Sequence, residues 1–461
     1  MGVTTALMTD LYELTMLEAA RRAGTAQRRC VFEVFTRSLP KGRRYGALAG
    51  TDRVLQAITD FRFDEQDIAY LRSTGLLAEE TLDFLASYRF TGDVHGYREG
   101  ELYFPGSPVL RVEGTFEQAV MLETVILSII NHDSGVASAG SRMTTAARGR
   151  PCIEMGGRRV HEEAAVAAAR AAYLVGFAST SNLAAGARYG IPVAGTAAHA
   201  FTLLFDTEED AFRAQLAAQG PNTALLVDTY DVEQAVRTAV DFAGPALGAV
   251  RLDSGDLEQQ AAWLRELLDS LGATSTRITA TGDLDEYRLE DLSDAPVDGY
   301  GIGTKLVTGG GHPAPGFVYK LVEREGADGA MHPVAKKSQD KQTLGCGKHA
   351  YRLITEGTAR AELVLPGDAE VEEFQRELRS ALTDRSAQEQ WERTQVQPLQ
   401  VPLMRGGERV EAVSPAQAVL AAREHHAVSV AQLGISADEG PDGPVAIPTI
   451  TDGTAAAALF S

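Results

Sequence analysis

The feature that most constrains this chain is a repeated order of short apolar strand, glycine-containing polar loop and helix after residue 150. Strands separated by helical stretches of about a dozen residues or more predict parallel pairing through crossover helices. The strand candidates are Cys152–Met155, Val193–Gly195, Leu225–Asp228, Ala249–Asp253, Arg277–Thr281 and Gly299–Gly303. We therefore expect an α/β fold with a parallel sheet that is barrel-like or doubly wound.

Each strand candidate is followed by polar or glycine residues. The runs are EMGGRR, AGTAAH, VDTYD, RLDSGD, ATGDLDE and GIGTK. In parallel α/β folds, ligands bind on the loops at the carboxyl ends of the strands. Strand ends rich in residue types that bind phosphates and sugars predict one convergent site.

The length predicts more than one structural unit, because a single core rarely grows beyond about 250–300 residues and this chain has 461. We expect an N-terminal α/β domain over residues 1–115, an α/β barrel over 116–320, and a C-terminal segment over 321–461 that packs on the first domain. Helical spacing predicts helices over 7–22, 45–58 and 116–132. The stretch 440–461, with its prolines, glycines and alanines, predicts a loosely ordered tail.

Charge and cysteine usage exclude several classes of protein. A net charge of −20 argues against nucleic-acid binding, which needs a basic face. An acidic protein that binds a polyphosphate must therefore concentrate Arg and Lys locally. The chain has three cysteines and no CxxC pair, which predicts a reduced compartment. It has no run of about 18 apolar residues, and Asp10 and Glu13 stand near the start. We therefore expect a cytoplasmic protein with no membrane segment.

The run RLDSGDL (251–257) places a cation and two carboxylates at a strand end. Arg251 is a candidate to lie along a planar or anionic ligand. Asp253 is a candidate to contact ribose hydroxyls or Mg²⁺ through water, because carboxylates and phosphates share magnesium in such sites. The alternative is a helix cap formed by Ser254 or Asp256.

The next two strand ends supply further candidates. In ATGDLDE, Gly282 allows close backbone approach and Asp283 can contact a ribose. In GIGT, the turn over Gly301, Gly303 and Thr304 offers consecutive backbone N–H groups for a monophosphate. A single GxGT turn is common in such folds. Its position at the end of the strand series is what favours a phosphate site here.

Paired arginines, Arg158 and Arg159, stand before an alanine-rich helix. Cations at a helix N-terminus oppose the helix dipole, and diphosphate binding explains them because guanidinium groups match phosphate oxygens. The alternative is ion pairing with Glu154, Glu162 or Glu163.

His199 lies in VAGTAAHAF, where small neighbours leave its ring open to a cavity. A nucleophilic role is physically possible, although a lone histidine is more often a structural or surface residue.

The segment KKSQDKQTLGCGK (336–348) is basic and contains glycines. It is either a lid, in which Lys341 and Lys348 contact ATP or phosphate, or a solvated run of charges.

Taken in order, these motifs resemble the nicotinate phosphoribosyltransferase family over essentially the whole chain. The matching blocks are TDLYELTM (9–16), FEVFTRSLPKGRRYG (32–46), EMGGRR, GFASTSNLAAGARYGIPVAGTAAHAF (176–201), VRLDSGDL, GIGT and VYKLVE (318–323). The resemblance implies a type II phosphoribosyltransferase fold, with an irregular α/β barrel beside a domain built from both chain ends. It also implies a homodimer.

The resemblance implies a role for several residues. Tyr12 stacks on the pyridine in the partner subunit's barrel, Thr196 and Arg251 contact nicotinate, His199 is phosphorylated, and Thr304 and Arg158 bind phosphates of phosphoribosyl pyrophosphate (PRPP). The implied reaction joins nicotinate to the ribose-phosphate of PRPP in NAD biosynthesis, with Mg²⁺ present and ATP consumed through phosphohistidine.

The sequence departs from the family pattern in the proposed pyridine pocket. Met155 stands where family members usually carry Phe, and Gly157 replaces a bulkier or polar residue. Ser181 is neutral where the related nicotinamide-specific enzymes carry Asp, which suits a carboxylate substrate. The alternatives are a nicotinamide or a quinolinate phosphoribosyltransferase, or a catalytically silent nucleotide-binding relative.

Overall fold

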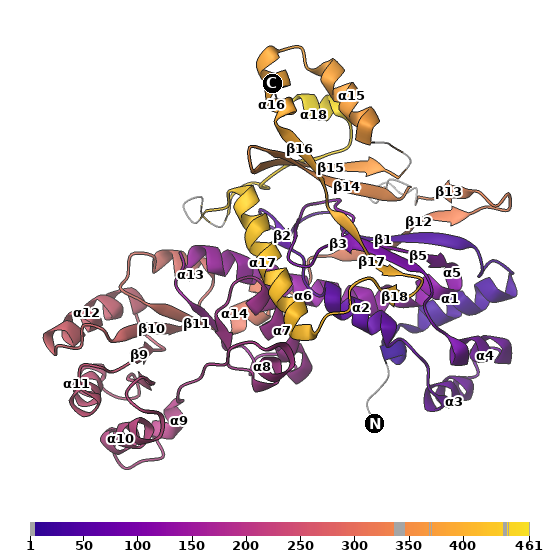
Figure 1. Ribbon diagram of the computed structural model, residues 1–461. Helices are drawn as coiled ribbons and strands as arrows, with labels where there is room; N and C mark the ends of the chain where they lie inside the picture. Colours follow the sequence, from indigo (N-terminus) through magenta and orange to yellow (C-terminus); the bar gives the residue numbers. More distant parts are fainter. Residues whose placement is uncertain are drawn as a thin grey trace. The chain divides into compact units, whose positions relative to one another are not determined.

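The computed structural model describes residues 5–335, 346–367, 369, 371–436, 440 and 442–460. The chain forms two compact units, which are described separately. Unit 1 comprises 1–134, 314–435 and 443–461, and unit 2 comprises 135–313 and 436–442. Figure 1 labels the elements of both units.

Unit 2 is built on a six-stranded sheet in the order β7-β6-β11-β10-β9-β8, and every neighbouring pair is parallel. The strands are β6 (Cys152–Glu154), β7 (Ser179–Thr180), β8 (Ala224–Leu226), β9 (Ala249–Leu252), β10 (Arg277–Gly282) and β11 (Gly299–Ile302). The predicted parallel α/β sheet is confirmed. The strand predicted over Val193–Gly195 is wrong, because Val193 forms only an isolated bridge to Thr180 and the remaining strand is β7.

Helices connect these strands. They are α7 (Glu162–Leu174), α8 (Leu183–Tyr189), α9 (His199–Thr202), α10 (Glu208–Gln219), α11 (Val232–Ala243), α12 (Leu257–Ser270), α13 (Glu286–Asp291) and α14 (Thr304–Val307), with the 3₁₀ turn η3 (Gly309–Gly311). Asp231, Asp256 and Asp285 cap α11, α12 and α13 by accepting hydrogen bonds from backbone N–H groups of their first turns. These caps start each helix just beyond the loop that follows a strand.

Unit 1 contains a seven-stranded antiparallel sheet in the order β13-β12-β1-β5-β3-β17-β18. Its strands are β1 (Arg29–Thr36), β3 (Asp93–Tyr97), β5 (Leu110–Thr115), β12 (Phe317–Glu325), β13 (Met331–Pro333), β17 (Gln400–Arg405) and β18 (Glu408–Arg409). β2 (Gly46–Ala47) and β4 (Leu102–Tyr103) form a separate pair. Strands from both ends of the chain share one sheet, and Phe32 of β1 stacks on Tyr319 of β12.

Helices of unit 1 pack with this sheet around one large apolar core. They are α1 (Leu11–Arg22), α2 (Thr51–Thr59), α3 (Glu65–Thr74), α4 (Glu79–Ser87) and α5 (Phe116–Ala119), with the 3₁₀ turns η1 (Thr5–Met8) and η2 (Val120–Leu122). The helix predicted over 45–58 starts only at Thr51, because residues 46–47 pair as β2. The predicted helix over 7–22 is interrupted between Met8 and Leu11.

A second sheet of unit 1, in the order β16-β14-β15-β19, has its own apolar core. It comprises β14 (Lys348–Thr355), β15 (Thr358–Pro366), β16 (Thr394–Pro398) and β19 (Thr449–Ile450), with α15 (Val371–Ala381), α16 (Arg385–Glu392) and α18 (Gly453–Ala457). The expectation of a loose tail after residue 440 is wrong for the described residues, because Ile450 and Phe460 are buried in this core.

Two long helices complete the fold. α6 (Glu123–Ala146) runs through the boundary of the units between residues 134 and 135, and the second boundary lies between 313 and 314. We placed the boundaries at 115 and 320 from the sequence; the first half of α6 instead packs in the core of unit 1 through Val125, Ile126 and Ile130. α17 (Pro415–Leu433) starts at a capping box formed by Ser414 and Gln417.

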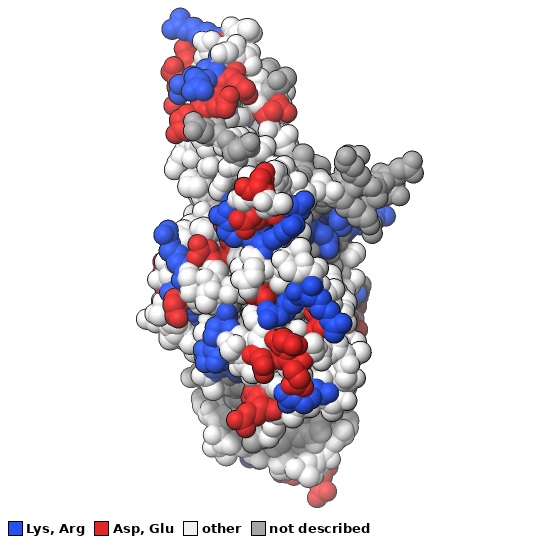
Figure 2. Space-filling view, turned by 90° about the vertical axis from the view of Figure 1, so that its right-hand side faces the viewer, with Lys and Arg blue, Asp and Glu red and all other residues white. Residues whose placement is uncertain are grey.

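Basic and acidic side chains are interspersed over the face drawn in Figure 2. Within the described residues, no helix has the length and apolar character needed to cross a membrane.

A buried ion pair joins the two sheets of unit 1 at the start of β14. The Lys348 ammonium and backbone N–H both donate to the carboxylate of Glu33 in β1, and both residues are buried. Burial raises the pKa of Glu33, and the positive charge of Lys348 acts in the opposite direction. Lys348 therefore favours the ionised form of Glu33 against the effect of burial.

Lys348→Met should lower the free energy of unfolding by about 3–5 kcal/mol at neutral pH, because it leaves a buried carboxylate without its cation. The deficit should shrink as the pH falls, since a protonated Glu33 needs no partner. Denaturant unfolding of both proteins over a pH series measures this. Arg72→Gln, which breaks the exposed pair with Glu79, is the control and should leave the free energy of unfolding nearly unchanged, because water screens the pair; an equal loss in both variants would contradict the prediction.

Candidate active site

The carboxyl ends of the strands in unit 2 are aligned at one edge of the sheet. The register pairs Glu154 with Thr180 on one side and with Ile302 on the other, and Ile302 pairs with Gly282. β9 continues the series, with Leu252 opposite Ala280. The loops predicted to carry the chemistry therefore start side by side.

Arg251 is fixed above this edge by residues from two other loops. Its Nε donates to Thr281 Oγ1 at 3.0 Å, and its Nη1 donates to Thr196 Oγ1 at 3.1 Å and to the Ala197 carbonyl at 3.2 Å. Its Nη2 has only a 3.4 Å contact to Asp253. The guanidinium is thus held in one orientation and keeps donor capacity on one nitrogen.

Asp228, the second residue of VDTYD (227–231), connects three loops and was not singled out from the sequence. Its Oδ2 accepts from the backbone N–H of Asp253 at 2.9 Å and from the hydroxyl of Ser254 at 3.0 Å. Its other oxygen, Oδ1, is buried and has no hydrogen-bond partner among the described residues. An ionised carboxylate with one unsatisfied buried oxygen is suited to a cationic or proton-donating group.

That group is His199, the first residue of α9. Its Nε2 lies 3.9 Å from Asp228 Oδ1, and its Nδ1 lies 3.1 Å from the Thr229 hydroxyl. The side chain is 41% exposed, so the ring is oriented on both nitrogens and still open to solvent. This geometry combines a positioned imidazole, an adjacent carboxylate and room for a ligand, which are requirements for nucleophilic catalysis.

Glu154 and Arg158 follow the same strand but differ in what they contact. Glu154 is buried and accepts hydrogen bonds from Gly156 N–H and the Thr180 hydroxyl; burial raises its pKa. Arg158 is exposed and forms no ion pair within the described part of the chain. The alternative in which Arg158 pairs with Glu154 is therefore wrong, and Arg158 remains available to an anion.

Two glycines at this edge are required by the geometry. Gly282 has φ +130°, which side chains rarely adopt. Gly301 has no such φ, but an added Cβ would lie 2.5 Å from Thr281 and 2.7 Å from the Met155 sulfur. Met155 thus occupies the space that Gly301 leaves open.

Three other residues complete the set expected at the strand ends. Gly303 and Thr304 form the turn into α14, and Asp283 is exposed directly after β10. The structure thus brings to one sheet edge the strand-end residues Met155, Arg158, Arg251, Asp253, Gly282, Asp283, Gly301, Gly303 and Thr304, and places Thr196 and His199 beside Arg251 and Asp228 through the contacts above.

Comparison with known proteins identifies the family. Residues 7–131 match the model of the nicotinate phosphoribosyltransferase (NAPRTase) N-terminal domain. The chain is 56% identical over 369 residues to "Nicotinate phosphoribosyltransferase pncB1" of Mycobacterium tuberculosis, covering 78% of this chain and 81% of that protein. It is 37% identical over 368 residues to "Nicotinate phosphoribosyltransferase" of Bacillus subtilis, with 77% and 74% covered.

The chain belongs to the nicotinate phosphoribosyltransferase family.

The solved structures agree with this membership. The structure of human nicotinic acid phosphoribosyltransferase matches 98% of this chain and 99% of that chain, at 25% identity and a TM-score of 0.77. The expected α/β fold of a type II phosphoribosyltransferase is confirmed, and the chain is an enzyme of the phosphoribosyltransferase class.

The predicted site has three further members, and the expected reach of Tyr12 into the partner's barrel stays a prediction. Tyr12 is in unit 1, 44% exposed on α1, and burial together with the carboxylates of Glu123 and Glu13 raises its pKa to about 12. Lys341 lies outside the described residues. Lys348 is a correction: it is buried against Glu33 and is not free to form a polyphosphate lid.

Gly301→Ala should lower the free energy of unfolding by about 1–3 kcal/mol, because the added methyl group must displace Met155 or Thr281. Adding Met155→Ala should restore part of this loss, since it removes one of the two clashes. Gly195→Ala is the matched control, because an added Cβ there meets nothing within 4 Å. Thermal and denaturant unfolding of the four proteins measures the effect; no rescue by Met155→Ala would contradict the packing argument.

Proposed function

We propose that this protein is an ATP-coupled nicotinate phosphoribosyltransferase of NAD biosynthesis. It joins nicotinate to the ribose-phosphate of PRPP, giving nicotinate mononucleotide and pyrophosphate, and converts ATP and water to ADP and phosphate. The observation that carries the proposal is the joint placement of a fixed Arg251 and an oriented His199 by Asp228, Asp253 and Thr281, which lie at the carboxyl ends of β8, β9 and β10. Family membership supports it.

Nicotinate is a planar anion, and the geometry of Arg251 suits it. The guanidinium is planar, and its Nη2 keeps donor capacity for a carboxylate. Thr196, which fixes Nη1, lies on the same side of the site. Ser181 brings no negative charge to repel the substrate, and Met155 supplies a flexible apolar wall.

PRPP presents a monophosphate, a ribose and a diphosphate, each matched by a different strand end. Backbone N–H groups of the Gly301–Thr304 turn suit the monophosphate, and Asp253 and Asp283 suit ribose hydroxyls. Arg158, unpaired and following β6, suits the diphosphate. The pyridine nitrogen then attacks C1 of the ribose while the C1–O bond breaks and pyrophosphate leaves with its electron pair.

Magnesium enters this scheme mainly with the substrate phosphates. Among the described residues, no group of three or more His, Cys, Asp or Glu side chains is arranged to hold a metal ion. Mg²⁺ characteristically keeps several waters and takes one or two carboxylates plus phosphate oxygens. Asp253, acting through water, fits such a role, and the bound ion would reduce the charge on the leaving pyrophosphate.

His199 is proposed to take the γ-phosphoryl group of ATP, releasing ADP, and to give it to water, releasing phosphate. Its two ring nitrogens are held near Thr229 and Asp228. The Asp228 carboxylate favours a positive charge on the ring, which develops when a nitrogen is phosphorylated. Hydrolysis of the phosphohistidine supplies the free energy that moves the equilibrium toward the mononucleotide.

We propose that the active form is a homodimer in which Tyr12 reaches the partner's barrel. Apolar side chains at the end of η1 and in the first turns of α1 are exposed: Met8, Leu11, Tyr12 and Met16 are 58%, 54%, 44% and 38% exposed. Such a cluster on a helix is typical of an interaction surface. A neutral Tyr12 hydroxyl, ensured by its raised pKa, suits stacking on a pyridine.

The deciding assay mixes purified protein with PRPP, Mg²⁺ and either nicotinate or nicotinamide, with and without ATP, and quantifies the mononucleotide. We expect product from nicotinate that increases with ATP, and we expect His199→Ala to lose that increase. Acid-labile ³²P from [γ-³²P]ATP on the wild type, absent in His199→Ala, identifies the phosphohistidine. Product only from nicotinamide would overturn the substrate assignment, and no product from either pyridine would favour a silent relative.

Thr281→Val should raise the KM for nicotinate about ten-fold, because losing the acceptor of Arg251 Nε costs roughly 1–3 kcal/mol. The substitution keeps the shape of the side chain, so the ATP-dependent phosphorylation of His199 should persist. Thr276→Val is the control, since the Thr276 hydroxyl is buried and has no hydrogen-bond partner among the described residues. Steady-state kinetics with varied nicotinate measures the change; equal KM values in all three proteins would refute the role of Thr281.

A further inference from the structure

Unit 1 contains a pocket of about 760 Å³ between α2, β17 and α17 that shares no residue with the strand-end site. Its size falls within the range of roughly 300–1,000 Å³ that is typical of small-molecule sites. Its lining is Thr51, Asp52, Leu55, Arg98, Glu99, Val401, Pro402, Leu403, Arg409, Val410, Glu411, Val413, Gln417, Ala418, Ala421, Ala422, Glu424, His425 and Val428. Apolar side chains predominate, and several of them remain exposed.

The exposed apolar groups lie on α17 and on the segment before it. Val428 is 53% exposed, Val410 is 46% and Val413 is 43%. On the opposite wall, Leu55 and Leu403 belong to or pack against the core of unit 1. Together they form an apolar surface that an uncharged ligand body would remove from water.

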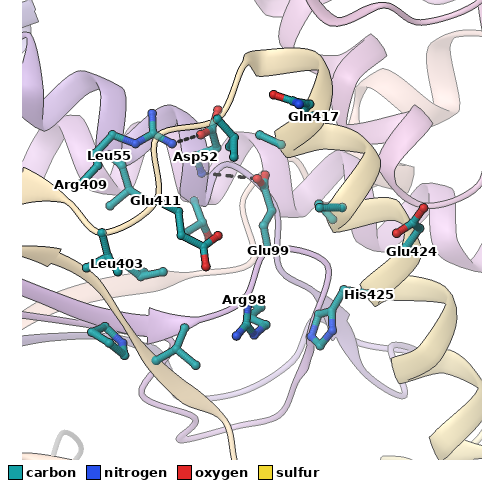
Figure 3. Close-up of a pocket in the computed structure, with 18 of the residues that line it drawn as sticks. Asp52, Leu55, Arg98, Glu99, Leu403, Arg409, Glu411, Gln417, Glu424 and His425 are labelled. Carbon is teal, nitrogen blue, oxygen red and sulfur yellow. Dashed lines mark hydrogen bonds and ion pairs between the residues drawn. The ribbon is translucent and has the colours of Figure 1, made fainter.

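Most charged groups of this pocket are already paired. Asp52 binds Arg409, and the Glu99 carboxylate accepts from the backbone N–H groups of Gly50 and Asp52 at the start of α2. Figure 3 shows Glu99 turned toward that helix. His425 contacts the buried Glu101 at 2.9 Å.

Arg98 is the exception among the cations. It lines the pocket beside Glu99, and within the described residues it has neither an ion pair nor a side-chain hydrogen bond. Figure 3 draws Arg98 among the lining residues with no interaction to any of them. The loop that carries it is anchored, because Gly100 O contacts His426 Nδ1 of α17 at 3.0 Å.

We propose that this pocket binds a small monocarboxylic acid with an apolar body, whose carboxylate contacts Arg98 and whose body lies against α17 and β17. The neighbouring acids Asp52 and Glu99 are neutralised by Arg409 and by the start of α2, so they repel an incoming carboxylate less than free acids would. Glu411 and Glu424 are exposed and unpaired in the described structure. They disfavour ligands with several negative charges, which selects a single carboxylate.

The test measures binding of decanoate, decanol and decylamine to the full-length protein by calorimetry and thermal shift, below their micelle concentrations. The three probes share one alkyl chain and differ in the charge of the head group. We expect decanoate to bind at least ten-fold more tightly than decanol, and decylamine to bind more weakly still. Equal binding of decanoate and decanol, tighter binding of decylamine, or no binding of decanoate would overturn the proposal.

Two pairs of variants locate the binding. Arg98→Gln should weaken the binding of decanoate about ten-fold, consistent with the loss of a charged hydrogen bond. Its control is Arg62→Gln, which changes an exposed arginine of unit 1 outside the pocket and should leave the binding unchanged. Ala421→Trp should fill the pocket and abolish binding, whereas Ala427→Trp, exposed on the same helix but outside the lining, should not. Equal effects within either pair would refute the site. None of these measurements requires turnover, so their outcome is independent of the proposed function.

Discussion

The parallel register of the unit 2 sheet is the constraint on which the site depends. Because all six strands run the same way, their carboxyl ends lie at one edge, and residues separated by about 150 positions in the sequence become neighbours. Gly282 pairs with Ile302, and Ile302 pairs with Glu154, so the loops after β10, β11 and β6 start together. An antiparallel pairing anywhere in this series would send one of these loops to the other edge of the sheet.

Within that edge, Asp228 connects His199 to the loop that follows β9. Its Oδ2 fixes the loop of Asp253 and Ser254, and its Oδ1 faces His199. Arg251 is fixed separately, by Thr196 and Thr281. His199, the proposed phosphoryl acceptor, and Arg251, the proposed nicotinate contact, are therefore held by two sets of interactions. The two sets meet at the loop after β9, where Arg251 also approaches Asp253. The proposed coupling of the two reactions would have a short route through these residues.

Much of this could be predicted from the sequence because the signals are local. Apolar runs followed by glycine and polar residues located five of the six parallel strands, and the RLDSGDL run located Arg251 and Asp253. The sixth strand, β7, is two residues long and carries no clear apolar run, and the strand predicted over Val193–Gly195 fell on a segment with only an isolated bridge. Asp228 and Thr281 were also missed as site residues, since their roles lie in hydrogen bonds to loops 25–30 positions away. Lys348 shows the opposite error: the sequence predicts either a phosphate contact in a lid or a solvated lysine, and only the tertiary pairing with Glu33 reveals its burial.

Arginine pairing separates structural cations from those available to ligands in this acidic chain. Arg352 is buried between Glu101 and Glu362, and Arg53 pairs with the buried Asp133. Such residues are committed to carboxylates of the protein itself. An unpaired arginine on an open surface, such as Arg62, is solvated by water and carries no functional information. Arg158 and Arg98 differ from both groups, because each is unpaired among the described residues and each lies where the fold provides a concave or convergent surface. With a net charge of −20 opposing anions at long range, these local cations are the places where an anionic ligand gains most from direct contact.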